Sequence, residues 1–162
     1  MGHTHYWYLE VGARKEVERR MPVIVEDFTR LLPHLPPLAG PLGEEEPILG
    51  NRVVFNGPKP HDYEDLTFPD WGHLVKPAWS RETWAFDFCK TGPSAQAKRP
   101  YDLAVRAFLL VARIHLGTLV RLYSDAPLAD WAEAASLIEG VLSLPTDIYT
   151  LLETRLLEVE DG

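Results

Sequence analysis

Basic residues stand next to the predicted start of a long apolar helix. The first turn of a helix presents free backbone N–H groups and the positive end of the helix dipole, so neighbouring cations favour a phosphate or pyrophosphate. The residues expected to bind such an anion are Lys90, Thr91, Lys98, Arg99, Tyr101 and Asp102. The GxxxxGK[ST] pattern of a P-loop is absent. In the alternative interpretation, Lys98 and Arg99 are solvated loop charges and Asp102 caps the helix.

Ser124 and Asp125 end the strand that is predicted after this helix. A strand, a helix and a second strand in this order normally form a right-handed crossover with parallel strands. Lys90, the helix start and Asp125 would then meet at one rim of the sheet, where open α/β sheets usually bind ligands. Asp125 could accept hydrogen bonds from a ribose diol there, or it could form a local turn before the next helix.

Aromatic residues alternate along three predicted strands and therefore fall on both faces of a sheet. One group belongs to the core, and the other offers flat apolar rings on which a nucleotide base could stack. The set is Tyr6, Trp7, Tyr8, Phe55, Trp84, Phe86 and Phe88. We predict that Tyr6, Tyr8 and Trp84 contact the base. Asn56, at the end of the strand NRVVFNG, completes the predicted ligand-binding set.

Two further patterns suggest a cysteine nucleophile and a metal site, but each lacks the additional residues that such a site requires. Cys89 lies beside Lys90, and His5, His61 or His115 could serve as its base, but no nucleophile signature surrounds it. A small buried side chain is the better interpretation of Cys89. His3 and His5 form an HxH pair on one strand face, yet the sequence identifies no third metal ligand. No catalytic residue, metal site or cofactor is therefore predicted.

The hydrophobic pattern predicts an α/β (α+β) fold in a single domain. A mixed sheet of about four or five strands carries helices packed on it, with a right-handed β-α-β crossover over residues 83–125. The strands are expected at residues 4–11, 51–57, 62–69, 83–91 and 118–125, and the helices at 17–32, 100–117, 127–141 and 145–159. The domain is assigned to residues 1–145, and residues 146–162 are predicted to form a C-terminal helical extension.

Three of these segments carry additional expectations. The helix over 100–117 is apolar on nearly every side, so it must be packed against other elements on several faces. Pro22 is expected only in the first turn of its helix. Residues 33–50 are dense in Pro and Gly and indicate a loop.

Six motifs in order resemble a family of small uncharacterised proteins of bacteriophages, prophages and bacteria. They are HTHYWY, FNG, TF at Thr67–Phe68, FCKT, RPYD, and SD followed by DW at Asp130–Trp131. The resemblance extends from the N-terminus to about residue 142. The chain departs from the family pattern in a lengthened GPSAQ connection, in YSDA where SSDG is usual, and in the added C-terminal helix. The last of these could serve an oligomer or partner contact.

Composition limits the classes of protein to consider. A formal net charge of −8 argues against a broad nucleic-acid surface. A single cysteine excludes an internal disulfide and fits a reducing cytoplasm. The N-terminus lacks an apolar signal segment, and no apolar run reaches the roughly 20 residues of a membrane span. The 14 prolines, mostly between predicted elements, would suit a thermophile protein.

These observations favour non-enzymatic binding of a small phosphorylated, nucleotide-like ligand in the cytoplasm. Given the resemblance to phage-borne families, the concrete version is an anti-defence protein that captures a host immune signal. The alternative is a protein-interaction module that docks on a host enzyme through the apolar stripe of the C-terminal helix. An enzyme acting on such a nucleotide ranks last, because no paired carboxylates, triad or metal motif is visible in the sequence.

Overall fold

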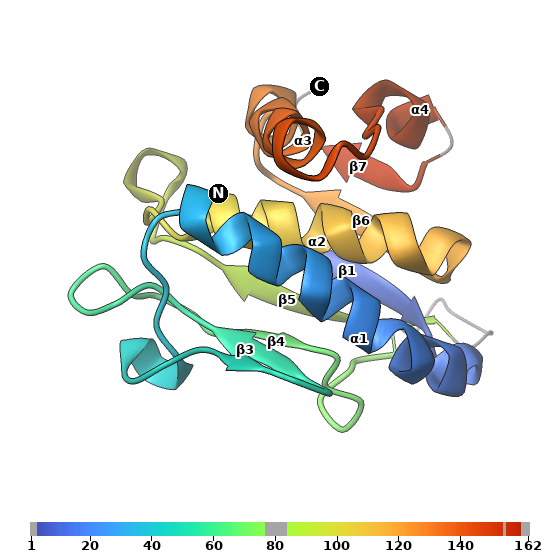
Figure 1. The fold of residues 1–162 in the computed structure, drawn as a ribbon, viewed down its shortest axis with the longest axis horizontal. Coiled ribbons are helices and arrows are strands. Elements are labelled where there is room, and N and C mark those ends of the chain that lie inside the picture. The colour runs from blue at the N-terminus through green and yellow to red at the C-terminus, as the bar shows by residue number, and fades with distance from the viewer. Residues whose placement is uncertain (1–2, 77–83, 154, 160–162) are drawn as a thin grey trace.

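The computed structural model describes residues 3–76, 84–153 and 155–159. The strands are β1 (Thr4–Glu10), β2 (Ile48–Leu49), β3 (Val53–Phe55), β4 (Leu66–Phe68), β5 (Trp84–Lys90), β6 (Val120–Ser124) and β7 (Leu157–Val159). The helices are α1 (Arg14–Leu31), α2 (Asp102–Leu116), α3 (Leu128–Leu142) and α4 (Ile148–Glu153). Figure 1 shows these elements as one α+β domain, which confirms the predicted fold class.

The main sheet has four strands in the order β5-β1-β6-β7. β1 pairs antiparallel with both β5 and β6, and β7 pairs parallel with β6. β5 and β6 therefore run in the same direction with α2 between them, as predicted for residues 83–125. They are not neighbours, however, because β1 lies between them. The expectation that they lie side by side was wrong.

A second, smaller sheet contains β2, β3 and β4 in antiparallel pairs. The single sheet predicted from the sequence is thus divided in two. Phe55 belongs to this smaller sheet, and its ring is fully buried against Phe28 of α1 and Phe108 of α2. It contributes to the core between the two sheets and the helices, not to a face that could bind a base.

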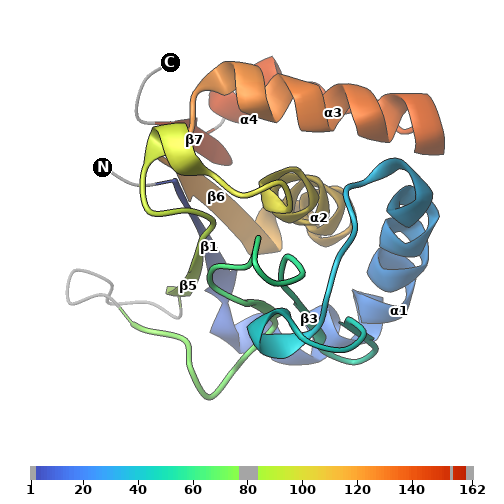
Figure 2. The same cartoon turned by 90° about the vertical axis from the view of Figure 1, so that its left-hand side faces the viewer.

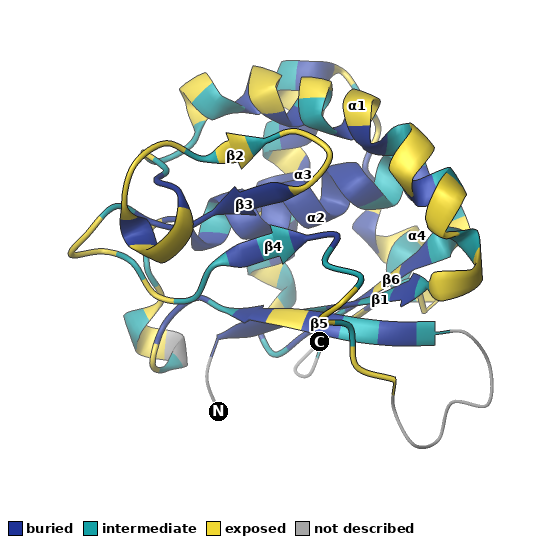
Figure 3. Ribbon diagram, turned by 90° about the horizontal axis from the view of Figure 1, so that it is seen from below, coloured by how far each residue is buried: buried dark blue, intermediate teal, exposed yellow. Residues whose placement is uncertain are grey.

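Helix α2 lies at the centre of the molecule, as its uniformly apolar sequence predicts. Eleven of its side chains are buried, among them Leu109, Leu110 and Val111 on consecutive positions. Figure 2 shows α1, α2 and α3 on the same side of the main sheet, with α2 between the sheet and α1. Figure 3 shows in dark blue the buried residues of α2 and of the strands against which it packs. Among the described helices, none is both long and apolar enough to cross a bilayer.

Helix α1 buries the predicted stripe of Val17, Met21, Ile24, Phe28 and Leu31. Its start at Arg14 puts Pro22 in the helix interior, which corrects the expectation that Pro22 would lie in the first turn. An interior proline removes one backbone hydrogen bond and costs about 3 kcal/mol. Burial of the apolar stripe against α2 and the small sheet offsets this cost.

The C-terminal segment differs from the long helix predicted over residues 145–159. Helix α4 ends at Glu153, Arg155 adopts a positive φ of 58°, and the chain then forms β7 beside β6. The spacing of Leu151, Leu152 and Leu156 suits a helix, but pairing with the free edge of β6 decides the conformation. This segment is therefore part of the main sheet.

Candidate functional site

Four of the predicted ligand residues, Lys90, Thr91, Ser124 and Asp125, lie at one end of the main sheet. The strand register pairs Thr4 with Lys90 and His5 with Ser124, and the Thr91 N–H donates to the His3 carbonyl. Because side chains alternate along a strand, Lys90 projects from the outer face, away from the helices, whereas Thr91 and Ser124 face α2. Asp125 follows the end of β6, and its Oδ1 accepts a hydrogen bond from the Thr4 N–H at 2.7 Å.

On the inner face, a buried polar network surrounds His5 and Asp102. The His5 Nε2 lies 2.6 Å from Asp102 Oδ1, and its Nδ1 lies 2.7 Å from Ser124 Oγ. The Thr91 hydroxyl donates to the same Asp102 oxygen at 2.6 Å, and Arg106 Nε donates to Asp102 Oδ2 at 2.7 Å. All five side chains are buried. Thr91, Asp102 and Ser124 thus hold β1, β5, β6 and α2 together and do not face the surface.

The network continues to the start of α3. Arg106 donates to the Asp130 carbonyl and contacts the Glu133 carboxylate at 3.2 Å. Lys98 Nζ donates to Asp130 Oδ2 at 3.0 Å. His3 Nε2 lies 3.3 Å from carboxylate oxygens of both Asp102 and Asp130. The predicted phosphate ligand Lys98 is therefore already paired with a carboxylate.

The pKa of Asp102 is shifted by its surroundings in the folded chain. Burial alone would raise this pKa, but the neighbouring His3, His5 and Arg106 side chains hold it well below its ordinary value of 3.8. The unfolded chain consequently takes up a proton first as the pH falls. The ionised Asp102 carboxylate therefore stabilises the folded chain fully well above pH 4. This contribution to stability is lost as the pH falls through that value toward the pKa of Asp102 in the folded chain.

We expect this titration to appear in the pH dependence of stability. Chemical denaturation near pH 7 and near pH 3 should show that the protein with Asp102 loses more unfolding free energy on acidification than the Asp102→Asn variant, because only the carboxylate can titrate. Equal losses in the two proteins would show that Asp102 is not held ionised by the network.

Three other predicted ligand residues also have structural contacts. Arg99 Nε donates to the Asp62 carbonyl at 3.3 Å, and its guanidinium lies 5.9 Å from the centre of the Tyr63 ring. The buried Tyr101 hydroxyl donates to the Glu64 carbonyl at 2.5 Å. Asn56 is buried, and its side-chain amide makes four hydrogen bonds to the 56–65 loop. Arg99 alone of these keeps partial exposure.

Cys89 is fully buried at the end of β5, as the simpler sequence interpretation predicts. Burial, together with the negative charge of Glu64, raises the pKa of its thiol well above the ordinary value. A thiolate nucleophile needs the opposite shift. The thiol instead contacts the Glu64 carbonyl at 3.5 Å. Cys89 is thus a core residue beside the polar network.

The outer face of the main sheet carries an aromatic surface, which we define as Tyr6, Tyr8, Trp84, Phe86, Phe88 and Tyr123. Register places Tyr6 between Phe88 and Tyr123, and Tyr8 opposite Phe86. The ring centroids of these neighbours are 5.4–5.8 Å apart. Trp7 points to the opposite face and is fully buried. The predicted division of the aromatic residues between two faces is confirmed for β1, whereas the aromatic residues of β5 all lie on the outer face.

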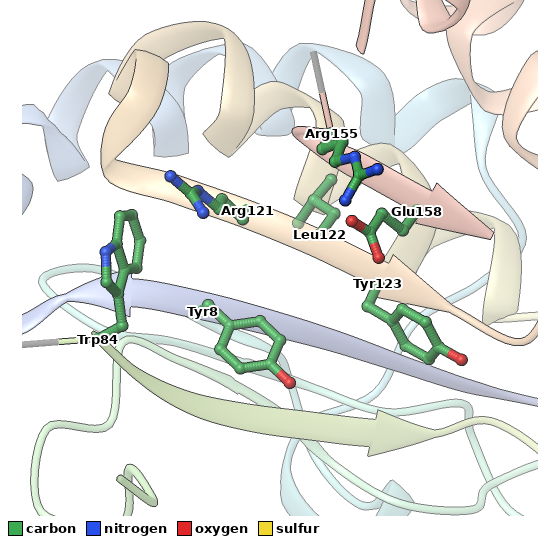
Figure 4. Close-up of a pocket in the computed structure, with 7 residues that line it drawn as sticks. All are labelled: Tyr8, Trp84, Arg121, Leu122, Tyr123, Arg155 and Glu158. Carbon is green, nitrogen blue, oxygen red and sulfur yellow. The ribbon is translucent and has the colours of Figure 1, made fainter. Parts of the chain in front are cut away.

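A groove of about 300 Å³ crosses one end of this aromatic surface. Figure 4 shows its lining residues: Tyr8, Trp84, Arg121, Leu122, Tyr123, Arg155 and Glu158. The Arg121 guanidinium lies 4.8 Å from the centre of the Trp84 ring, within the range of a cation–π contact. Arg155 and Glu158 lie across β6 from Trp84. The groove thus combines aromatic walls with exposed cations.

Partial burial, with Tyr123 and Glu158 nearby, raises the pKa of Tyr8 above its ordinary value of 10.0. The Tyr8 side chain therefore stays neutral at physiological pH and does not repel an anion. Glu158 is the acidic residue among the lining side chains. With two arginines against one glutamate, the groove is locally basic in a chain of net charge −8.

Several groove residues were not identified from the sequence. Alternation along RLYS was a usable signal, because it puts Arg121 and Tyr123 on the face opposite Leu122 and Ser124. Arg155 and Glu158 could not be assigned to the groove because a helix was predicted over these residues. They reach the groove only because the chain forms β7. Trp84 and Lys90 lie at opposite ends of β5, roughly 20 Å apart at the usual rise per residue. They do not form one compact site.

Comparisons of the chain with protein-family models, with curated proteins and with solved structures found no match. The motif resemblance therefore remains a prediction.

Proposed function

We propose that the protein binds a small phosphorylated, nucleotide-like ligand in the groove of Trp84 and Arg121, without turning it over. The observation that carries the proposal is the juxtaposition of these two side chains, with 4.8 Å between the guanidinium and the ring centre. An aromatic ring can stack on any type of base, and an arginine can pair with phosphate through two parallel hydrogen bonds. Trp84 and Arg121 lie close enough for one ligand to make both interactions.

The remaining lining residues fit the other parts of such a ligand. Tyr8 and Tyr123 widen the aromatic wall beside Trp84, and Arg155 supplies a second exposed cation. The Glu158 carboxylate is exposed at the same groove and is suited to accept hydrogen bonds from ribose hydroxyls. Base, phosphate and sugar would each have a chemically matched partner.

Lys90 and Asp125 retain a role in this proposal at the other end of the main sheet. Strand alternation puts Lys90 on the same face as Tyr6 and Tyr8, and Asp125 lies at the same end of the sheet, where its Oδ1 accepts a hydrogen bond from the Thr4 N–H. A ligand with more than one nucleotide would extend from the groove along the aromatic surface toward Lys90. This favours dinucleotides and larger cyclic nucleotides over a mononucleotide.

The resemblance to phage-borne proteins gives the proposal a concrete form. In this form the protein is an anti-defence protein that sequesters a nucleotide immune signal of the host cell. Titration calorimetry with cyclic dinucleotides, cyclic trinucleotides and ADP-ribose derivatives tests it. We expect micromolar or tighter binding of at least one of them. No measurable heat with any member of the series would count against the nucleotide proposal.

Substitutions in the groove should weaken binding of the ligand found in this way. Loss of one stacking ring costs about 1–3 kcal/mol per base. We therefore expect Trp84→Ala to raise Kd by roughly 5- to 150-fold. Arg121→Gln should also raise Kd and should reduce its dependence on salt, because a phosphate contact is lost.

Matched controls are available outside the groove. Trp71 and Arg30 are the same residue types, and neither lines the groove. Trp71→Ala and Arg30→Gln should leave Kd unchanged. If the control variants weaken binding as much as the groove variants, the ligand binds elsewhere.

The alternative of a protein-interaction module keeps one of its two supports, the acidic net charge of −8. The other support was the apolar stripe of the C-terminal helix, but Ile148 is buried and Leu151 and Leu152 pack against the core. Native mass spectrometry of the protein purified from cells separates the two cases. A bound small molecule favours the nucleotide proposal, and a stoichiometric protein partner favours the interaction module.

A further inference from the structure

Two histidines and one aspartate converge in the buried network on the inner side of the main sheet. The side chains of His3, His5 and Asp102 each offer one ligand atom, and these atoms all lie within 4.8 Å of one another. The three residues are 0–1% exposed. We propose that they bind a divalent transition-metal ion such as Zn²⁺, with Asp130 as a further ligand. This site is separate from the groove, which lies on the other face.

The state of His3 is the observation that points to an ion. Both ring nitrogens of His3 are buried, and neither makes a hydrogen bond within the described part of the chain. Buried polar groups without partners are uncommon in folded proteins and destabilise them. The His3 Nε2 lies 3.3 Å from Asp102 Oδ2 and from Asp130 Oδ2. An ion between these atoms would bond directly to a histidine nitrogen that otherwise has only these long contacts with carboxylates.

Two of the distances between these atoms match those of ligands around one small cation. Nitrogen and oxygen ligands lie about 2.0–2.1 Å from Zn²⁺, which puts neighbouring ligands of a tetrahedral site about 3.3 Å apart. Both distances from His3 Nε2 have this value. The His5–Asp102 contact of 2.6 Å is a hydrogen bond. On binding, the ion would displace the proton in this contact and move the two side chains apart by less than 1 Å.

The surrounding residues are arranged as a second layer that orients the ligands. Metal-bound histidines usually donate their other ring nitrogen to an acceptor, and ligating carboxylates are held by hydrogen bonds. His5 Nδ1 lies 2.7 Å from Ser124 Oγ, and Asp102 is held by Thr91 and Arg106. These contacts leave His5 Nε2 directed at the other ligands. The tautomer required for metal binding is thus compatible with the existing contacts.

The charge balance of the site also allows an added cation. Asp102 and Asp130 bring two negative charges, which Arg106 and Lys98 balance through contacts of 2.7 and 3.0 Å. Lys98 is the more accessible of the two cations, since its side chain is 38% exposed and that of Arg106 is 2% exposed. The ion would replace the Lys98 ammonium on Asp130 and would enter from that side. The enclosed ligand set favours a structural ion that joins β1, α2 and α3.

The experiment uses tag-free protein that has been stripped with EDTA. Calorimetry with ZnCl₂ and visible absorption on addition of CoCl₂ report stoichiometry and coordination, and a thermal unfolding scan reports stabilisation. We expect one ion per chain, a tetrahedral cobalt spectrum, release of protons on binding and a higher unfolding midpoint. Absence of one-to-one binding by the unmodified chain would overturn the proposal.

Variants locate the ion within the chain. His3→Gln should weaken Zn²⁺ binding by more than about 100-fold while the protein stays folded, because the His3 side chain loses only two 3.3 Å contacts with carboxylates. Ser124→Ala should weaken it about 10- to 100-fold, as is typical of a second-layer residue. His61→Gln, at an exposed histidine, is the control and should bind normally. Unchanged affinity in His3→Gln would place the ion elsewhere.

Discussion

Replacing Asp102 by alanine should lower the free energy of unfolding by about 3–5 kcal/mol, because it leaves the buried Arg106 charge with the exposed Glu133 carboxylate as its remaining ion-pair partner. Arg106 is only 2% exposed and makes its 2.7 Å contact with this carboxylate. His5 and Thr91 would each lose a hydrogen bond to the same group. Chemical denaturation followed by circular dichroism measures the change.

An exposed carboxylate is the appropriate control for this substitution. Glu16 contacts Arg19 and Arg20 on the surface of α1. Glu16→Ala should leave stability nearly unchanged, since water screens such pairs. A double variant, Asp102→Leu with Arg106→Met, should recover most of the loss, because both charges are removed together. An effect of Asp102→Ala as small as that of Glu16→Ala would show that the network does not stabilise the fold.

A loss of about 3–5 kcal/mol is also expected for Phe108→Ala, through a different mechanism. The Phe108 ring is fully buried and lies edge-on to the rings of Phe28, Phe55 and Phe68, with centroids 5.2–6.2 Å away. These rings come from α1, β3 and β4. Removing Phe108 leaves a cavity where the small sheet meets the helices.

Phe88→Ala provides the matched comparison for Phe108→Ala. Phe88 is 41% exposed on the outer face of the main sheet. Its removal exposes little new apolar surface and should cost much less stability. Thermal unfolding of the two variants under identical conditions tests the difference. Similar costs would mean that the core between the two sheets is less tightly packed than described.

Local sequence patterns were sufficient to identify most elements of the fold. The uniformly apolar run in α2 predicted a helix packed on several sides, and alternation in β1 placed His5, Trp7 and Leu9 on the inner face. Both properties depend on residues a few positions apart. Strand neighbours are different, since β1 is joined to partners about 80 and 120 residues away. No local pattern specifies that β1 lies between β5 and β6.

The same limit applies to the two candidate sites. Tyr6, Tyr8 and Trp84 could be assigned to one face from alternation alone. The Asp102 carboxylate could be recognised as a partner of His3 and His5 only when the start of α2 was placed beside the start of β1. The C-terminal leucines fit a helix, but tertiary pairing with β6 overrides this preference after Arg155.

The position of β1 in the main sheet has a consequence for how the chain is made. The central strand β1 leaves the ribosome before both of its partners, and the partner positions around Phe86 and Leu122 are synthesised much later. Pairings so distant in sequence slow the search for the native topology. Both edges of β1 are unpaired until β5 emerges, and one edge stays unpaired until β6 emerges. Trp7 and Leu9 remain exposed on the nascent chain during this time, a condition that favours aggregation and engagement by chaperones.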